Sequence, residues 1–121
     1  MILLDTSVWV DHLRRGDSLA IQVLESGQAG AHAFVTGELD CGNLKSRVRV
    51  IDLLKALPQL ALATDDEVLY FIEGHNLMGR GIGYVDAHLL AAAAIGDSLL
   101  WTRNKRLREI ATELGVDYLA Q

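Results

Sequence analysis

Short apolar runs alternate along this chain with segments of helical periodicity. Residues 2–4 form an unbroken apolar run, which predicts a fully buried strand that ends at Asp5. In the segment that follows, Trp9 and Leu13 lie four residues apart and share one face of an amphipathic helix. Residues 19–26 predict a second helix, with Ser18 as its N-cap and Gly27 at its end. The chain therefore opens with a strand followed by two helices.

The middle of the chain repeats this alternation. Residues 31–35 predict a second strand, and Thr36 is placed to begin a helix that carries Glu38. Residues 48–57 predict a further helix, which ends before the single proline because proline cannot continue the helical hydrogen bonds. A third strand is expected over residues 60–63.

The last part of the chain begins with a capping box, in which Thr64 and Glu67 exchange hydrogen bonds at a helix N-terminus. The elements expected after it are helices to about residue 78, over 84–95 and over 104–114, and strands over 98–101 and 116–119. Strands that alternate with helices indicate an α/β fold with a parallel sheet, helices on both faces and right-handed crossovers.

The composition fits one compact domain over residues 1–121. Half of the residues are hydrophobic, so the chain can bury a sizeable core without a structural metal. Cys41 is the single cysteine, which excludes an internal disulfide; we expect a small buried residue and a reducing cytoplasm. No basic segment precedes the first apolar run, and residues 89–95 are far short of the ~20 that span a membrane, so we expect no signal peptide and no membrane association.

The formal net charge of −5 argues against simple electrostatic attraction to nucleic acid. It does not exclude a nucleic-acid substrate if acidic side chains converge on a divalent cation, because the ion then dominates the local field. Basic side chains are also clustered in residues 45–49 and 103–108. Each cluster is suited either to a phosphate backbone or to a solvated helix face.

Asp5 stands at the carboxyl end of the first predicted strand. Open α/β sheets bind their ligands at this edge, at the point where the strand order reverses. The same residue is also placed to cap the following helix together with Thr6 or Ser7. Its position favours a site without deciding between the two roles.

Two further acidic residues are candidates for the same site. A helical register places Asp86 at the head of a core-facing apolar stripe that runs to Ala94. Burying an unpaired carboxylate there costs roughly several kcal/mol, so a helix N-terminus or a cation should compensate it. Glu38 shares a face with Cys41 and Gly42, whose small size lets the glutamate point inward. For both acids, an ordinary first-turn position is the alternative.

Other polar residues have simpler explanations. Asn104 and Thr102 follow the fourth predicted strand, where a helix cap is the safer role for Asn104 and support of an active site is the other. The acidic run 65–67 is explained by the capping box and the helix dipole. Asp11 and Arg15 have the spacing of a surface ion pair, and the four histidines show no metal-ligand spacing.

Together these motifs resemble the PIN-domain family, and more closely the VapC-type toxins of bacterial toxin–antitoxin pairs. The segments that carry the resemblance are Asp5-Thr6-Ser7 with Trp9, Thr36-Gly37-Glu38-Leu39, Asp86-Ala87-His88-Leu89-Leu90-Ala91 and Leu100-Trp101-Thr102-Arg103-Asn104-Lys105-Arg106-Leu107. The resemblance covers essentially the whole chain and keeps the order and spacing of the motifs.

The resemblance implies a three-layer α/β/α sandwich whose central parallel sheet has strand order 3-2-1-4-5. The positions that match the family are the metal-binding acids Asp5, Glu38 and Asp86 and the supporting polar residues Ser7 and Thr102. Asn104 departs from the pattern, because many members have a fourth acidic residue there. This departure puts a second metal ion in doubt.

Carboxylate ligands favour Mg²⁺ or Mn²⁺. Our hypothesis is that Asp5 and Asp86 hold the principal ion and that Glu38 positions or deprotonates the attacking water, with one ion or with two. The resemblance further implies an endoribonuclease that leaves 5′-phosphate and 3′-hydroxyl ends, a homodimer, and a VapB-type antitoxin that covers the acidic site.

Three other protein classes share some of these features. A response-regulator receiver needs an acidic doublet after the first strand and a lysine near the last one, whereas Asp5 stands alone and the last strand has no lysine. A haloacid-dehalogenase-type phosphatase needs a second aspartate where Ser7 stands. A catalytically impaired PIN domain that binds RNA or a protein without cleavage is the strongest alternative, because Asn104 removes one acid.

Overall fold

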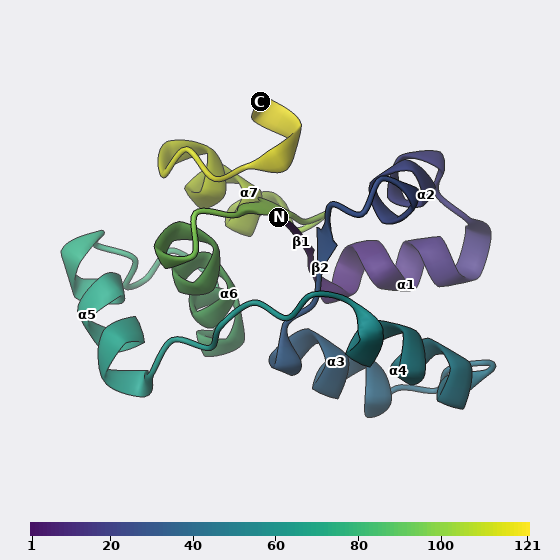
Figure 1. The fold of residues 1–121 in the computed structure, drawn as a ribbon. Coiled ribbons are helices and arrows are strands. Elements are labelled where there is room, and N and C mark those ends of the chain that lie inside the picture. The colour runs from purple at the N-terminus through teal and green to yellow at the C-terminus, as the bar shows by residue number, and fades with distance from the viewer.

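The computed structural model describes residues 1–121 as three short strands and seven α-helices (Figure 1). The elements in chain order are β1 (Ile2–Leu4), α1 (Thr6–Arg15), α2 (Ser18–Glu25), β2 (Ala29–Gly30), α3 (Ala33–Asp40), α4 (Arg47–Ala56), α5 (Asp65–Gly74), α6 (Tyr84–Ile95), β3 (Leu99–Trp101), α7 (Lys105–Glu113) and a 3₁₀ turn (Tyr118–Ala120). The strands lie in the middle, with α1 to α4 on one side and α5 to α7 on the other (Figure 1). The predicted α/β fold class is confirmed.

The three strands form one parallel sheet in the order β2-β1-β3. In its register, Leu3 lies opposite Gly30 on one side and opposite Leu100 on the other. The third expected strand, over 60–63, does not form, and only Gln59 just before it makes a parallel bridge, to Ala31. The fifth expected strand is reduced to one parallel bridge, from Asp117 to Leu100 of β3. The five-stranded order 3-2-1-4-5 is therefore not confirmed. In the third expected strand, Leu62 is exposed, so burial does not hold that segment against the sheet.

The second strand, β2, ends at Gly30, so the predicted strand over 31–35 does not form. The reason is His32, whose backbone is extended and whose Nδ1 accepts the N–H of Phe34 at 3.0 Å, so that this histidine is the N-cap of α3. Helix α3 consequently begins three residues earlier than expected, and Glu38 lies in its second turn. Histidine is not a favoured cap residue, so the sequence pattern did not show this boundary.

Other helix boundaries are also set by side chains. Helix α2 is capped by Asp17 and not by the serine that follows it. Helix α5 ends at Gly74, before the predicted residue 78. The reciprocal cap of Thr64 and Glu67 is confirmed, with hydrogen bonds of 2.9 and 3.1 Å. The predicted helix over 84–95 has the expected bounds.

Asp65 does not take part in the reciprocal cap that was expected to explain it. Its Oδ1 accepts a hydrogen bond from the Tyr84 hydroxyl and lies 3.2 Å from Nε2 of His88. Tyr84 and His88 are four residues apart and share a face of α6. Asp65 therefore joins the first turn of α5 to the first turns of α6.

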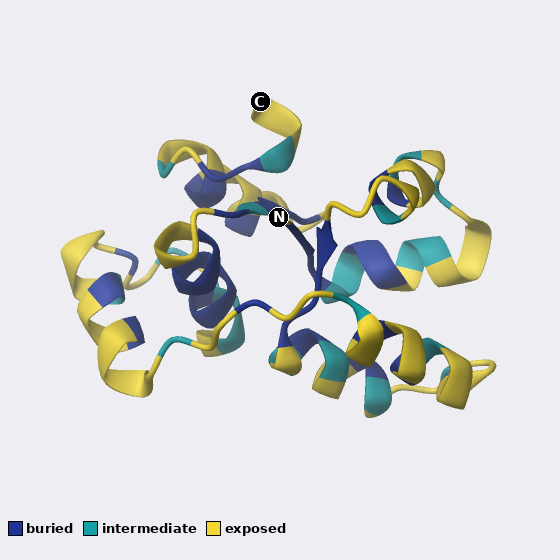
Figure 2. Ribbon diagram, viewed as in Figure 1, coloured by how far each residue is buried: buried dark blue, intermediate teal, exposed yellow.

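The core is centred on the sheet and on α6. Leu3, Leu4 and Leu100 are fully buried, and every residue of 87–93 on α6 is buried (Figure 2). This helix is thus covered on all sides rather than along one stripe, and Ala94, expected in the stripe, is exposed. No helix combines the length and apolarity needed to cross a lipid bilayer.

Cys41 was expected to be buried and is exposed. Helix α3 turns only Val35 and Leu39 into the core, and Cys41 lies just past its last turn. Gly42 is exposed as well. The small residues that were expected to let α3 approach the sheet therefore face solvent.

His32 is a buried titratable group near a second buried histidine. Its side chain is fully buried, and its Nε2 has no hydrogen-bond partner. Burial, together with the nearby His88, lowers the pKa of His32 from 6.5 to about 4. His32 is therefore neutral in the folded protein at neutral pH.

We predict that His32 makes the fold acid-sensitive. The unfolded chain takes up a proton on this residue near pH 6.5 and the folded chain near pH 4, so unfolding is favoured as the pH falls through this interval. The expected loss is on the order of 3 kcal/mol of unfolding free energy, measured by urea unfolding. His32→Asn keeps a side chain that can cap α3 but does not titrate. An equal loss in this variant would contradict the prediction.

Candidate active site

Asp5 lies between β1 and α1 with its carboxylate buried. Oδ1 accepts the N–H of Ser7 at 2.8 Å and the N–H of Val8 at 3.4 Å, which makes Asp5 the N-cap of α1. The Ser7 hydroxyl donates to the same oxygen. The capping role that the sequence left open is confirmed, and it occupies only one of the two carboxylate oxygens.

The second oxygen of Asp5 faces the segment after β3. Because β1 and β3 are parallel neighbours, their carboxyl ends meet, and the Thr102 hydroxyl donates to Oδ2 of Asp5. The Thr102 oxygen accepts the Asn104 N–H at 3.0 Å. The Ser7 oxygen accepts the Arg103 N–H, also at 3.0 Å. The two hydroxyls expected to support the site therefore fix the orientation of the Asp5 carboxylate.

Asn104 is the N-cap of α7. Its Oδ1 accepts the N–H of Leu107 at 3.1 Å. The cap, which the sequence favoured, is thus confirmed. The cap uses the amide oxygen and leaves the side-chain NH₂ group for another acceptor.

Asp86 lies in the first turn of α6 and is half-buried. Its Oδ2 accepts the N–H of Gly83 at 3.3 Å. Burial raises the pKa of Asp86 above its usual range, and the charges of Asp5 and Glu38 raise it further, although the hydrogen bond from Gly83 acts in the opposite direction. Asp5 and Glu38 are therefore close enough to Asp86 for their charges to affect it.

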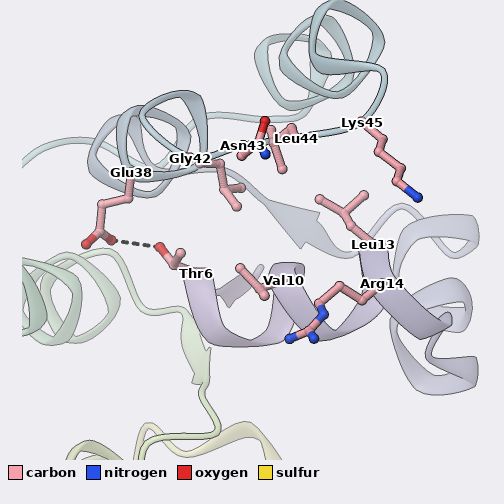
Figure 3. Close-up of a pocket in the computed structure, with 10 residues that line it drawn as sticks. Thr6, Val10, Leu13, Arg14, Glu38, Gly42, Asn43, Leu44 and Lys45 are labelled. Carbon is pink, nitrogen blue, oxygen red and sulfur yellow. Dashed lines mark hydrogen bonds between the residues drawn. The ribbon is translucent and has the colours of Figure 1, made fainter.

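Glu38 approaches this region from α3. The side chain is exposed, and its Oε1 accepts a hydrogen bond of 2.7 Å from the Thr6 hydroxyl (Figure 3). The expectation that Glu38 points inward among small residues is wrong, because it lies at the surface beside the N-terminus of α1. The sequence indicates only a capping role for Thr6, because its contact with Glu38 joins α1 to α3 and has no local signal.

The side chains as they stand do not form a complete metal site. No three histidine, cysteine, aspartate or glutamate side chains are arranged to hold one ion. The donors nevertheless fit Mg²⁺ or Mn²⁺ in kind, since they are carboxylate oxygens. The pKa of Asp86 is raised first by burial and then by the charges of Asp5 and Glu38, and a cation beside Asp86 would oppose both effects. Glu38 is the exposed member, so it is the side chain free to turn toward the other two acids.

The basic cluster over 103–108 is partly neutralised within the chain. Arg103 contacts Asp11 at 2.8 Å and Asp17 at 2.6 Å. Arg108 contacts a buried aspartate at 3.1 Å. The predicted ion pair between Asp11 and Arg15 is also present, at 2.8 Å. Only Lys105 and Arg106 of this cluster lack a carboxylate partner, so it offers fewer charges to RNA than the sequence suggested.

Comparison with known proteins covers nearly the whole chain. The PIN domain family matches residues 2–113. Ribonuclease VapC32, found in two strains of Mycobacterium tuberculosis, is 47% identical over 117 residues, which are 96% of this chain and 94% of that protein. The resemblance to VapC-type proteins is confirmed by this similarity. Since the family match and the relative both span the fold and the acidic residues, the chain belongs to the PIN-domain family.

Proposed function

We propose that this protein is a VapC-type toxin that acts as a metal-dependent endoribonuclease. The observation that carries the proposal is the position of Asp5 at the carboxyl edge of a parallel sheet, near enough to Asp86 for its charge, like that of Glu38, to raise the pKa of Asp86. The similarity to a protein named Ribonuclease VapC32 supports RNA as the substrate. The reaction is hydrolysis of an RNA phosphodiester bond.

In this proposal, Asp5 and Asp86 hold Mg²⁺ or Mn²⁺ with Glu38 beside them. When bound, such an ion supplies positive charge against the negative charge that develops on the phosphate oxygens. Ser7 and Thr102 keep the Asp5 carboxylate in one orientation through their hydroxyl hydrogen bonds. Glu38 is exposed, which lets it reach a water molecule and accept its proton.

The partners follow from the same family membership. We propose a VapB-type antitoxin that covers the acidic site and a homodimer of this chain. Apolar side chains that remain exposed on the helices support such contacts, among them Val48 and Leu53 on α4 and Leu69 and Tyr70 on α5.

A second candidate is a PIN domain that binds RNA without cleaving it. The observations that favour it are Asn104 in place of a fourth acid and the lack of a ready three-acid site. A binding module of this kind would hold RNA equally well in Mn²⁺ and in EDTA. Cleavage that requires the ion would exclude it.

We predict that Asp5→Asn and Asp86→Asn each reduce RNA cleavage by roughly 100-fold or more, because each removes a carboxylate proposed to hold the ion. The measurement is the release of 5′-phosphate ends from total cellular RNA in Mn²⁺ and in EDTA. Asp52→Asn makes the same chemical change on the exposed face of α4 and should cleave normally. Persistent cleavage by either active-site variant, folded as judged by circular dichroism, would disprove these assignments.

We predict that Asp86→Asn raises the melting temperature of the metal-free protein at neutral pH. Because the pKa of Asp86 is raised in the fold, its stabilising contribution is present below pH 3.8 and is lost as the pH rises through the folded pKa. The uncharged asparagine avoids this loss. Mn²⁺ should raise the melting temperature of the native protein and not that of the variant. Thermal unfolding with and without Mn²⁺ measures both effects, and equal Mn²⁺ stabilisation would contradict the assignment.

Asn104→Asp tests the departure from the family pattern. Aspartate caps helices as well as asparagine does, so α7 should be retained. We predict that the added carboxylate tightens Mn²⁺ binding, measured by calorimetric titration. Unchanged affinity would show that residue 104 acts only as a cap.

A further inference from the structure

A pocket of about 510 Å³ opens beside the proposed active site, between α1 and the end of α3 (Figure 3). The hydrogen bond between Thr6 and Glu38 lies at one end of it. Val10 and Arg14 follow Thr6 at intervals of four residues, so these side chains lie on one face of α1. From Thr6 to Arg14 this wall extends about 12 Å along the helix axis. The pocket is therefore continuous with Glu38 and long enough for a nucleoside with its flanking phosphate.

Four of the ten residues that line the pocket are apolar. Val10 and Leu13 are 37% and 38% exposed, although the sequence pattern placed Leu13 on the buried face with Trp9. Leu39 and Leu44 contribute from the other side. Pockets of about 300–1,000 Å³ with apolar walls and a few polar groups are typical of sites for small ligands or single ligand groups.

Two cations line the same pocket without a carboxylate partner. Arg14 and Lys45 form none of the ion pairs of this chain, whereas the neighbouring Arg15 and Arg47 are both paired. Lys45 lies at the end of the pocket away from Glu38 (Figure 3). In a protein with a net charge of −5, two unpaired cations on one pocket favour an anionic ligand.

We propose that this pocket binds the nucleotide next to the scissile phosphate of single-stranded RNA. The proposal rests on the proposed ribonuclease function and names the substrate contacts beside that site. Arg14 and Lys45 bind the phosphate on the far side of the nucleotide, and Val10 and Leu13 pack against its base. Asn43, which also lines the pocket, has an amide that can hydrogen-bond the edge of an unstacked base.

Charge distinguishes RNA from a protein segment as the occupant. An apolar peptide would cover Val10 and Leu13 but would leave Arg14 and Lys45 without counter-charges. A nucleotide supplies a base that packs against Val10 and Leu13 and a phosphate that pairs with Arg14 and Lys45. Its base must leave the stack to enter, so single-stranded RNA fits and a duplex does not.

The binding experiment uses Asp5→Asn protein, so that RNA is not cut, and a fluorescent single-stranded RNA of random sequence. Arg14→Ala with Lys45→Ala should weaken binding roughly tenfold. It should also reduce the slope of log K against log salt by about 0.7, because both cations bind one phosphate and a single strand contributes about 0.7 per phosphate contact. Arg49→Ala with Lys55→Ala removes two exposed, unpaired cations outside the pocket and should change affinity less than twofold.

A second variant tests the apolar part of the pocket. Leu13→Trp fills the space without changing the charge, and its partly exposed position tolerates a larger side chain. It should weaken RNA binding while the salt slope stays that of the parent protein. Photocrosslinking of RNA that contains 4-thiouridine should label peptides that contain residues 39–45. Labelling confined to other peptides would overturn the proposal.

The outcomes separate this proposal from the proposed function. If the double variant Arg14→Ala with Lys45→Ala binds and cleaves RNA like its parent, the pocket assignment fails and the ribonuclease assignment stands. If the native protein does not cleave RNA but the variants lose RNA binding as described, the ribonuclease assignment fails alone. Unchanged RNA binding together with lost binding of a protein partner would assign the pocket to that partner and overturn the RNA proposal.

Discussion

The buried carboxylate of Asp5 joins the end of β1 to α1 through one oxygen and to the segment after β3 through the other. The Thr102 hydroxyl oxygen also accepts the N–H of Asn104, which is the N-cap of α7. The same hydrogen bonds that close the sheet edge therefore also orient the residue on which the proposed chemistry depends. Fold stability and site geometry are coupled here, because both depend on one side chain.

The second constraint is the partial burial of Asp86 within the electrostatic influence of two other acids. A half-buried carboxylate near two others is unfavourable in the absence of a counter-ion, which is reflected in its raised pKa. The fold tolerates this because α6, which carries Asp86, is buried over residues 87–93 and is held to α5 by Asp65. The packing of α6 thus keeps the Asp86 carboxylate in a position where its own ionisation is unfavourable.

Sequence patterns predicted the features that depend on local signals. The helix over 84–95, the cap at Asn104 and the reciprocal cap of Thr64 and Glu67 each follow from neighbouring residues, and each is present. The acidic site stays a prediction, which rests on Asp5 at the end of a strand and on the family motifs for the other acids. Its relation to Thr6 could not be predicted, since that contact joins α1 to α3.

Features that depend on distant parts of the chain were predicted less well. His32 caps α3 from a buried position, and no local sequence pattern shows that burial. The exposure of Cys41 depends on how α3 packs against the rest of the chain. The pairing of Arg103 with Asp11 and Asp17 joins elements far apart in sequence. Which cations stay unpaired is consequently decided by tertiary structure and not by their clustering along the chain.

The reduction of both outer strands to single bridges has a consequence for the behaviour of the chain in a concentrated solution. A long edge strand presents a row of unpaired N–H and C=O groups, which can template the addition of a strand from another molecule. Here each outer side of the sheet continues for only one bridge, at Gln59 and at Asp117, before the chain turns into a loop or a 3₁₀ turn. The short edges therefore protect the protein against aggregation by sheet extension.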